Sequence, residues 1–290
     1  MKLATGVAAA ITTSGLVRAA GSPFAWKHFP AGPNGFFRAP VLLASGNEAL
    51  LVDGGFTYPD GRALADAIRA TGRNLTTIYV SQSDPDYYFG LKPVREAFPG
   101  ARVLAASATV AAIHAGVGKK LAVWGPQLGG NGPQSLADIV LPEAFDGAAL
   151  SVGGERVEII AADGLANRRY LWVPSLGAVF GGVLVFSGVH VWTADTPAQA
   201  QRSAWIAALD DMAARHPRVV IPGHMAPDAP VGLAAILHTR NYLVALEEEL
   251  PKAADAAALK AAMEARFPNL GMGVALDIGA KVLKGEMNWG

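Results

Sequence analysis

The 290-residue sequence contains no cysteine. A disulfide framework, a catalytic thiolate and a metal site with cysteine ligands are therefore excluded. An excess of one charge is also missing, because Lys and Arg together number 24, as do Asp and Glu, and the net charge at pH 7 is zero. Nucleic-acid-binding proteins usually carry a basic excess, so we expect no nucleic-acid partner.

Long apolar runs are missing as well. No run reaches the roughly 20 residues that a helix needs to span a bilayer, so we expect no membrane span. Residues 1–20 nevertheless have the outline of a secretory signal peptide, with one lysine, an apolar stretch and small residues at its end. A signal peptide here would make the protein periplasmic or secreted. If these residues are instead an N-terminal extension of the folded domain, we expect a cytoplasmic protein.

Apolar residues are abundant: 51% of the chain is hydrophobic and only 17% is charged. This composition supports a sizeable core and argues against disorder. Strand and helix patterns alternate along the chain, which indicates two mixed sheets with helices outside, in a single domain over residues 21–290 with a helical C-terminal part. Strands are predicted over 24–30, 36–45, 49–52, 75–80, 102–106, 139–141, 149–160, 170–173, 178–186 and 218–221. Helices are predicted over 60–70, 90–97, 108–115, 197–216 and most of 231–284, with a glycine-rich loop over 125–133.

Two polar loops directly follow predicted strands, where functional residues of α/β folds gather. The first is Ser-Gln-Ser-Asp-Pro-Asp-Tyr-Tyr over residues 81–88, and the second is Pro-Gly-His over 222–224. Polar groups that are enclosed at such places need hydrogen bonds or a bound ligand. These loops are therefore the candidate site.

The two loops, with two further segments, resemble the metallo-β-lactamase fold superfamily. Residues 81–87 lie where the family has Thr-His-x-His-x-Asp-His, and 222–224 match its Pro-Gly-His. Residues 51–55 are similar to its acidic-glycine turn, and 170–183 to its later strand pair. The four segments follow the family's order within residues 24–245. The resemblance implies an α/β fold, an αββα sandwich of two mixed β-sheets flanked by helices, with the site at one edge and hydrolase ancestry.

The family's metal ligands are largely replaced in this sequence. The resemblance places Gln82 and Asp84 at histidine positions of the first metal, and the bridging aspartate position holds a valine. At the second metal, Asp86 and His224 are kept, whereas Tyr87 replaces a histidine. Catalytic zinc usually takes three His or carboxylate ligands. We therefore expect that the dinuclear zinc site is lost.

Two states of the site remain open. In one, a single divalent ion (zinc, manganese or iron) is held by Gln82, Asp84, Asp86 and His224. In the other, no metal is bound, and the same side chains act as acids and bases.

The candidate catalytic residues are Asp84, Asp86, Tyr87, His190 and His224. Two carboxylates that lie two residues apart repel each other, which raises the pKa of one and suits general acid–base catalysis. Tyr87 and His190 are candidate proton donors, although a structural role for His190 is an equal alternative. Aromatic side chains next to these loops are the candidate substrate-binding residues: Tyr88, Trp124 and Trp192.

The sequence thus predicts a divergent hydrolase that acts on a small ester, lactone or amide. The alternative is a catalytically inactive pseudoenzyme that binds a small molecule or has a regulatory role. A homodimer is compatible with the alanine-rich C-terminal helices.

Overall fold

The computed structural model describes residues 16–18 and 23–289. Most of the expected signal peptide, including residues 1–15, lies outside the described residues. Within that segment, β1 (Val17–Arg18) pairs antiparallel with β2 (Ala25–His28). Over the described ranges, no helix is long and apolar enough to cross a membrane.

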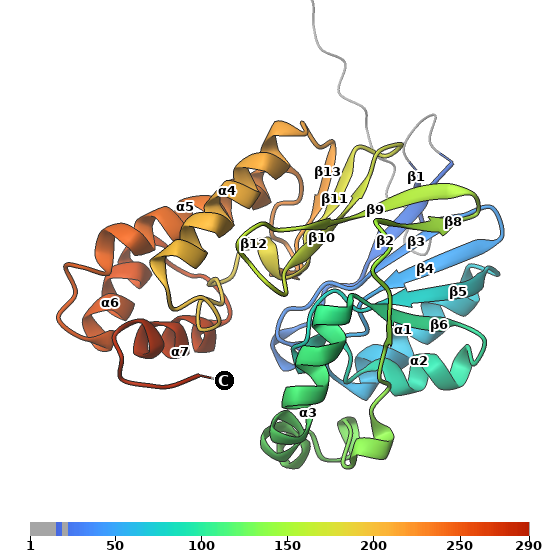
Figure 1. Cartoon of the computed structure of the whole chain (residues 1–290), viewed down its shortest axis with the longest axis horizontal. Helices are drawn as coiled ribbons and strands as arrows, with labels where there is room; N and C mark the ends of the chain where they lie inside the picture. The colour runs from blue at the N-terminus through green and yellow to red at the C-terminus, as the bar shows by residue number, and fades with distance from the viewer. Residues whose placement is uncertain (1–15, 19–22, 290) are drawn as a thin grey trace, which may run out of the picture.

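Two mixed β-sheets lie at the centre of the molecule (Figure 1). The first sheet has the order β1-β2-β3-β4-β5-β6-β7 and the second has the order β13-β11-β10-β9-β8. The remaining strands of the first sheet are β3 (Val41–Ser45), β4 (Glu48–Val52), β5 (Asn74–Tyr79), β6 (Arg102–Ala105) and β7 (Glu143–Ala144). Those of the second are β8 (Ala149–Val152), β9 (Glu155–Ala161), β10 (Arg169–Val173), β11 (Ala178–Phe180) and β13 (Val219–Ile221). A small parallel pair joins β12 (Phe186–Ser187) to β14 (His224–Met225).

Alternation along the strands divides the core into two layers. Leu43 of β3 belongs to an apolar cluster that also contains Val157 and Leu171 of the second sheet. The preceding residue, Leu42, belongs to the other cluster, together with Leu64 of a flanking helix. Successive side chains of a strand point to opposite faces, so one sheet face meets the other sheet and the opposite face meets helices.

Helices cover the outer faces of both sheets (Figure 1). The helices beside the first sheet are α1 (Tyr58–Ala70), α2 (Leu91–Ala97) and α3 (Ser107–Leu128). Those beyond the second are α4 (Gln199–Ala214), α5 (Leu233–Glu249), α6 (Ala256–Arg266) and α7 (Gly273–Leu283). The predicted αββα sandwich is confirmed by this arrangement.

Three predicted strands were too long. The one expected over 149–160 is a hairpin of β8 and β9, divided after Val152. The other two lie at the site. The strand expected over 36–45 begins only at Val41, because Phe36 and Phe37 take left-handed backbone angles with φ of 53° and 56°. The strand expected over 178–186 is broken after Phe180 by a 3₁₀ turn, Gly182–Leu184. In both cases the interrupted stretch lines the site that is described below.

The prediction for residues 108–141 was also wrong. Helix α3 continues to Leu128, well beyond its predicted end at residue 115 and into the start of the stretch expected to be a glycine-rich loop, 125–133. Its glycines lower helix propensity, but Thr109, Ile113 and Val117 bury one face at a helical spacing, and tertiary packing overrides the propensity. Residues 139–141 form no strand and instead follow a 3₁₀ turn, Leu136–Asp138.

Gly223 brings the Pro-Gly-His loop against the first sheet. Its carbonyl accepts a hydrogen bond from the N–H of Ala39 (2.9 Å), and its own N–H donates to the carbonyl of Val185 (2.9 Å). A Cβ atom at this position would lie 1.9 Å from the carbonyl oxygen of Gly182. Only glycine therefore allows the approach that places the next residue, His224, at the sheet edge.

We predict that Gly223→Ala lowers the free energy of unfolding by about 3 kcal/mol, because the clashing atoms belong to the backbone and cannot rotate away. Gly118→Ala is the matched control, since no atom lies within 4 Å of a Cβ placed there in α3. The control should gain up to about 1 kcal/mol from helix propensity. Urea unfolding measures both, and equal stability of the two variants would contradict this account.

Candidate active site

The loop after β5 is a 3₁₀ turn, Pro85–Tyr87. The N–H of Tyr87 donates to the carbonyl of Asp84 (3.0 Å). The carbonyl of Tyr87 in turn accepts from the N–H of Gly54 (2.7 Å), just after β4. The turn is therefore fixed to the ends of two neighbouring strands, and the side chains of Asp86 and Tyr87 have a defined direction.

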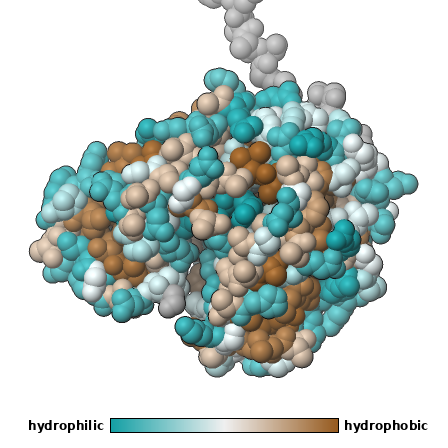
Figure 2. Space-filling model, viewed as in Figure 1, coloured by the Kyte–Doolittle hydropathy of each residue, from teal (hydrophilic) through white to brown (hydrophobic). Residues whose placement is uncertain are grey.

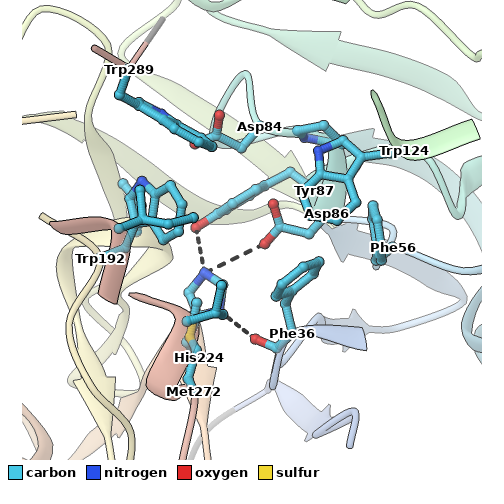
Figure 3. Close-up of a pocket in the computed structure, with 14 residues that line it drawn as sticks. Phe36, Phe56, Asp84, Asp86, Tyr87, Trp124, Trp192, His224, Met272 and Trp289 are labelled. Carbon is cyan, nitrogen blue, oxygen red and sulfur yellow. Dashed lines mark hydrogen bonds and ion pairs between the residues drawn. The ribbon is translucent and has the colours of Figure 1, made fainter. Parts of the chain in front are cut away.

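Three polar side chains converge at this edge (Figure 3). The Tyr87 hydroxyl lies 3.3 Å from Nε2 of His224, and Oδ2 of Asp86 lies 3.5 Å from the same nitrogen. Nδ1 of His224 lies 2.8 Å from the carbonyl oxygen of Phe36, so Nδ1 carries the proton and Nε2 presents a lone pair. Burial, together with the nearby Arg38, holds the pKa of His224 well below its usual value, and the imidazole stays neutral.

A buried arginine lies beside this group. Arg38 is fully inaccessible, and its guanidinium donates to Asp53 (2.7 Å) and to the carbonyl of Gly223 (2.6 Å). Its Nε lies 3.6 Å from Oδ2 of Asp86, and its Cζ lies 3.5 Å from the ring centroid of Tyr87. Because a guanidinium does not lose its proton in proteins, Arg38 is a permanent positive charge in the site.

Asp53 is the anchor of that arginine. It has a left-handed φ of 64° at the end of β4, and its carboxylate also accepts from the N–H (2.8 Å) and the hydroxyl (2.9 Å) of Ser81. Asp53 thus connects Arg38 to the strand end from which the candidate catalytic loop starts.

Asp86 is the titratable group of the site. Burial raises the pKa of its carboxyl to about 7, and the nearby Asp84 adds to the rise, whereas Arg38 opposes it. A carboxyl group with this pKa is present in both protonation states near neutral pH, as a general acid–base catalyst requires. Tyr87 differs, since burial raises the pKa of its phenol well above 10 and keeps it protonated.

Asp86, Tyr87 and His224 lie at the polar end of an otherwise apolar pocket that opens to solvent. The pocket lies between α3 and α7, and Figure 2 shows that the surface is hollowed between these two parts of the molecule. Most of its wall is aromatic or aliphatic (Figure 3). The remaining lining residues are Phe36, Phe56, Asp84, Pro85, Trp124, Val183, Trp192, Met272, Val274, Ile278 and Trp289.

The structure brings several predicted site residues together. Besides the three polar groups, Trp124 and Trp192 line the pocket. Asp84 lies at the boundary between this pocket and a second, polar cavity, and its carboxylate accepts from the ammonium of Lys120 (2.8 Å). The carboxylate of Asp84 is therefore already paired with a cation.

Three other predicted residues do not line the pocket. Oε1 of Gln82 accepts from the side chain of Asn167 (2.7 Å), and Gln82 faces the polar cavity instead. Nδ1 of His190 lies 3.1 Å from the hydroxyl of Tyr242, and the side chain of His190 is buried. Tyr88 is fully buried in the core.

The side chains present do not fit the family's two-metal site. Gln82 is turned away, Asp84 is paired with Lys120, and a hydrocarbon side chain stands at the bridging position. The described residues contain no group of three His, Cys, Asp or Glu side chains arranged to hold a metal ion. The guanidinium of Arg38, 3.6 Å from Asp86, would also repel a cation placed between Asp86 and His224.

Sequence reasoning missed Arg38 and most of the aromatic wall. Arg38 lies in no recognisable motif, and its partners Asp53 and Gly223 are 15 and 185 residues away in the sequence. The only local sign was the unusual Phe36-Phe37 pair before it. Trp289 lies beyond residue 284, where the predicted helical part ends, and no motif around it indicated a place in the site.

Comparison with known proteins agrees with this geometry. The sequence matches the model of the metallo-β-lactamase superfamily over residues 34–224. A metallo-β-lactamase from Pontibacter korlensis is 18% identical, with a TM-score of 0.57 over 79% of this chain and 98% of its own. A β-lactamase domain protein from Burkholderia ambifaria is 16% identical, with a TM-score of 0.65 over 95% and 88%. No curated protein sequence matches.

At these identities the two structures show a shared fold and nothing about substrate. The family model adds the sequence evidence, because it covers more than half of the chain and ends at His224. The chain therefore belongs to the metallo-β-lactamase superfamily and has its hydrolase fold.

Proposed function

We propose that this protein hydrolyses a small ester, lactone or amide with Asp86 as its acid–base group, His224 as the residue that orients the water, and without the family's dinuclear zinc. One observation carries the proposal: the Asp86 carboxyl, the Tyr87 phenol and the His224 imidazole meet at the polar end of an apolar pocket. A pocket that is mostly apolar, with a few convergent polar groups and a shifted pKa, is the usual form of an active site.

The arrangement supports a general-base mechanism. The ionised Asp86 accepts a proton from water, and the water oxygen forms a bond to the carbonyl carbon of the substrate. The neutral Nε2 of His224, 3.5 Å from Oδ2 of Asp86, accepts the second hydrogen bond of that water and orients it. The bond to the leaving oxygen or nitrogen then breaks, and Asp86 returns its proton to the leaving group.

Tyr87 and Arg38 support this cycle in different ways. The Tyr87 hydroxyl remains protonated, so it can donate a hydrogen bond to the oxyanion that forms on the carbonyl oxygen. Arg38 does not line the pocket and acts through Asp86, because its positive charge favours the ionised carboxylate.

A second candidate function is a small-molecule binding module without turnover. The contact between the Tyr87 hydroxyl and Nε2 of His224 favours it, since both groups already have a partner within 3.3 Å. Such a site would bind a neutral apolar ligand by the same walls. Turnover distinguishes the two functions, as ligand-induced stabilisation occurs in both.

We predict that Asp86→Asn and His224→Gln each lower kcat/KM at least about 100-fold on a panel of chromogenic esters and lactones, because the first removes the proton acceptor and the second removes the imidazole that orients the water. His114→Gln is the matched control, since His114 is exposed on α3, and it should keep the wild-type rate. Equal residual rates in wild type and Asp86→Asn would contradict the hydrolase proposal. Ligand-induced stabilisation without any turnover would instead support the binding module.

The pH dependence gives an independent prediction. Asp86 must be ionised to accept a proton, so kcat/KM should rise with pH, with an apparent pKa of about 7, and level off above it. Because its pKa is lowered, His224 stays neutral over the same pH range. It therefore causes no second change of rate in the pH profile. Initial rates between pH 5 and 9 test this. A profile that falls with rising pH would show that a protonated group is needed instead.

A further inference from the structure

The C-terminal part of the chain builds one wall of the pocket. Met272, Val274, Ile278 and Trp289 all line it. These residues lie beyond residue 224, where the match to the superfamily model ends. The part of the chain that carries the family resemblance therefore supplies the polar groups, and a separate segment, residues 272–289, supplies much of the apolar lining.

This segment is held firmly against the rim of the site. The carbonyl of Gly271 accepts from the N–H of His190 (2.9 Å), and Gly271 also bridges Val189. Further along, a Cβ on Gly279 would lie 2.5 Å from the hydroxyl of Thr193. Helix α7 therefore packs directly against the loop that contains Thr193. His190 therefore lies behind the wall that residues 272–289 form, outside the pocket, and its backbone helps to hold that wall in place.

Two aromatic groups form facing walls around the polar end (Figure 3). On one side, the rings of Trp192 and Trp289 meet edge to face with their centroids 5.0 Å apart. On the other, Trp124 contacts the rings of Phe36 and Phe56 edge to face at 5.2 Å and 5.5 Å. Ring-lined walls of this kind gain energy from a flat apolar group in addition to the area that it buries.

A second cavity adjoins the pocket and is polar. Its lining includes Lys120, Asn167 and Asp195, and it shares Asp84 and Trp289 with the apolar pocket. Trp289 thus lies between an apolar space and a polar one.

We propose that residues 272–289, and Trp289 above all, select a substrate with a ring-sized apolar group, such as phenyl or cyclohexyl, next to its reactive carbonyl. The reaction of such a substrate rests on the proposed hydrolase function, whereas its binding does not. The ring lies between the two aromatic walls, and the carbonyl carbon faces Asp86 and His224. Trp289 is then a specificity-determining residue that contacts the substrate and takes no part in proton transfer.

Binding is tested with phenylacetone, which has a phenyl group and a carbonyl but no leaving group. By calorimetry, wild type should bind phenylacetone at least about tenfold more tightly than acetone. Trp289→Ala should lose about tenfold in affinity for phenylacetone. The matched control is Met287→Ala, because Met287 is exposed in the same tail and does not line the pocket. It should bind as wild type does.

Unchanged phenylacetone affinity in Trp289→Ala, with an unchanged melting temperature, would overturn the proposal. So would wild-type affinity for phenylacetone no greater than for acetone. If Trp289→Ala melts at a lower temperature, Trp289→Leu is the smaller change at the same position. Reduced phenylacetone affinity in Trp289→Leu would support the proposal, and unchanged affinity would overturn it.

Hydrolysis of ethyl phenylacetate and ethyl acetate, followed by titration of the acid released, separates this proposal from the proposed function, because neither ester has an aromatic leaving group. Phenyl-selective binding without hydrolysis of either ester would overturn the hydrolase function and support the ligand class. Hydrolysis of both esters with equal kcat/KM would support the hydrolase and overturn the ligand class. A preference for the phenylacetyl ester that Trp289→Ala removes would support both.

Discussion

The buried ion pair between Arg38 and Asp53 is the interaction on which the rest of the site depends. Moving a guanidinium out of water costs several kcal/mol, and the cost must be offset by partners with good geometry. Arg38 finds them in the Asp53 carboxylate, the carbonyl of Gly223 and the face of the Tyr87 ring. These partners belong to three loops that are distant in sequence, so one side chain holds together the elements that surround the pocket. The close packing of Gly223 brings its carbonyl oxygen within hydrogen-bond distance of Arg38.

The charges of this cluster explain the chemistry that we propose. Arg38 and Asp53 neutralise each other, and the imidazole of His224 and the phenol of Tyr87 are both neutral. Asp86 is then the charge that can change, which agrees with a pKa raised to about 7 by burial. In the superfamily resemblance, a metal ion belongs between Asp86 and His224. In this chain the guanidinium of Arg38 lies next to that place, 3.6 Å from Oδ2 of Asp86.

Much of the fold could be predicted from the sequence, because alternation along β3 to β5 and the four family-like segments are local signals. The meeting of Asp86, Tyr87 and His224 followed from the same resemblance. Long-range contacts were the part that local patterns could not reveal. Nothing near Gln82 indicated that Asn167 would turn it away, and nothing near Arg38 identified its partners. Helix α3 was underestimated because its glycines obscured a buried face that only tertiary packing makes evident.

We propose that this site works without a metal ion between Asp86 and His224. Elemental analysis of tag-free protein after dialysis against zinc, and then against metal-free buffer, tests it most directly. The account predicts a zinc content far below one equivalent, the same in wild type and in His224→Ala. One equivalent of zinc in wild type that is lost in His224→Ala would contradict it, because His224 would then be a metal ligand.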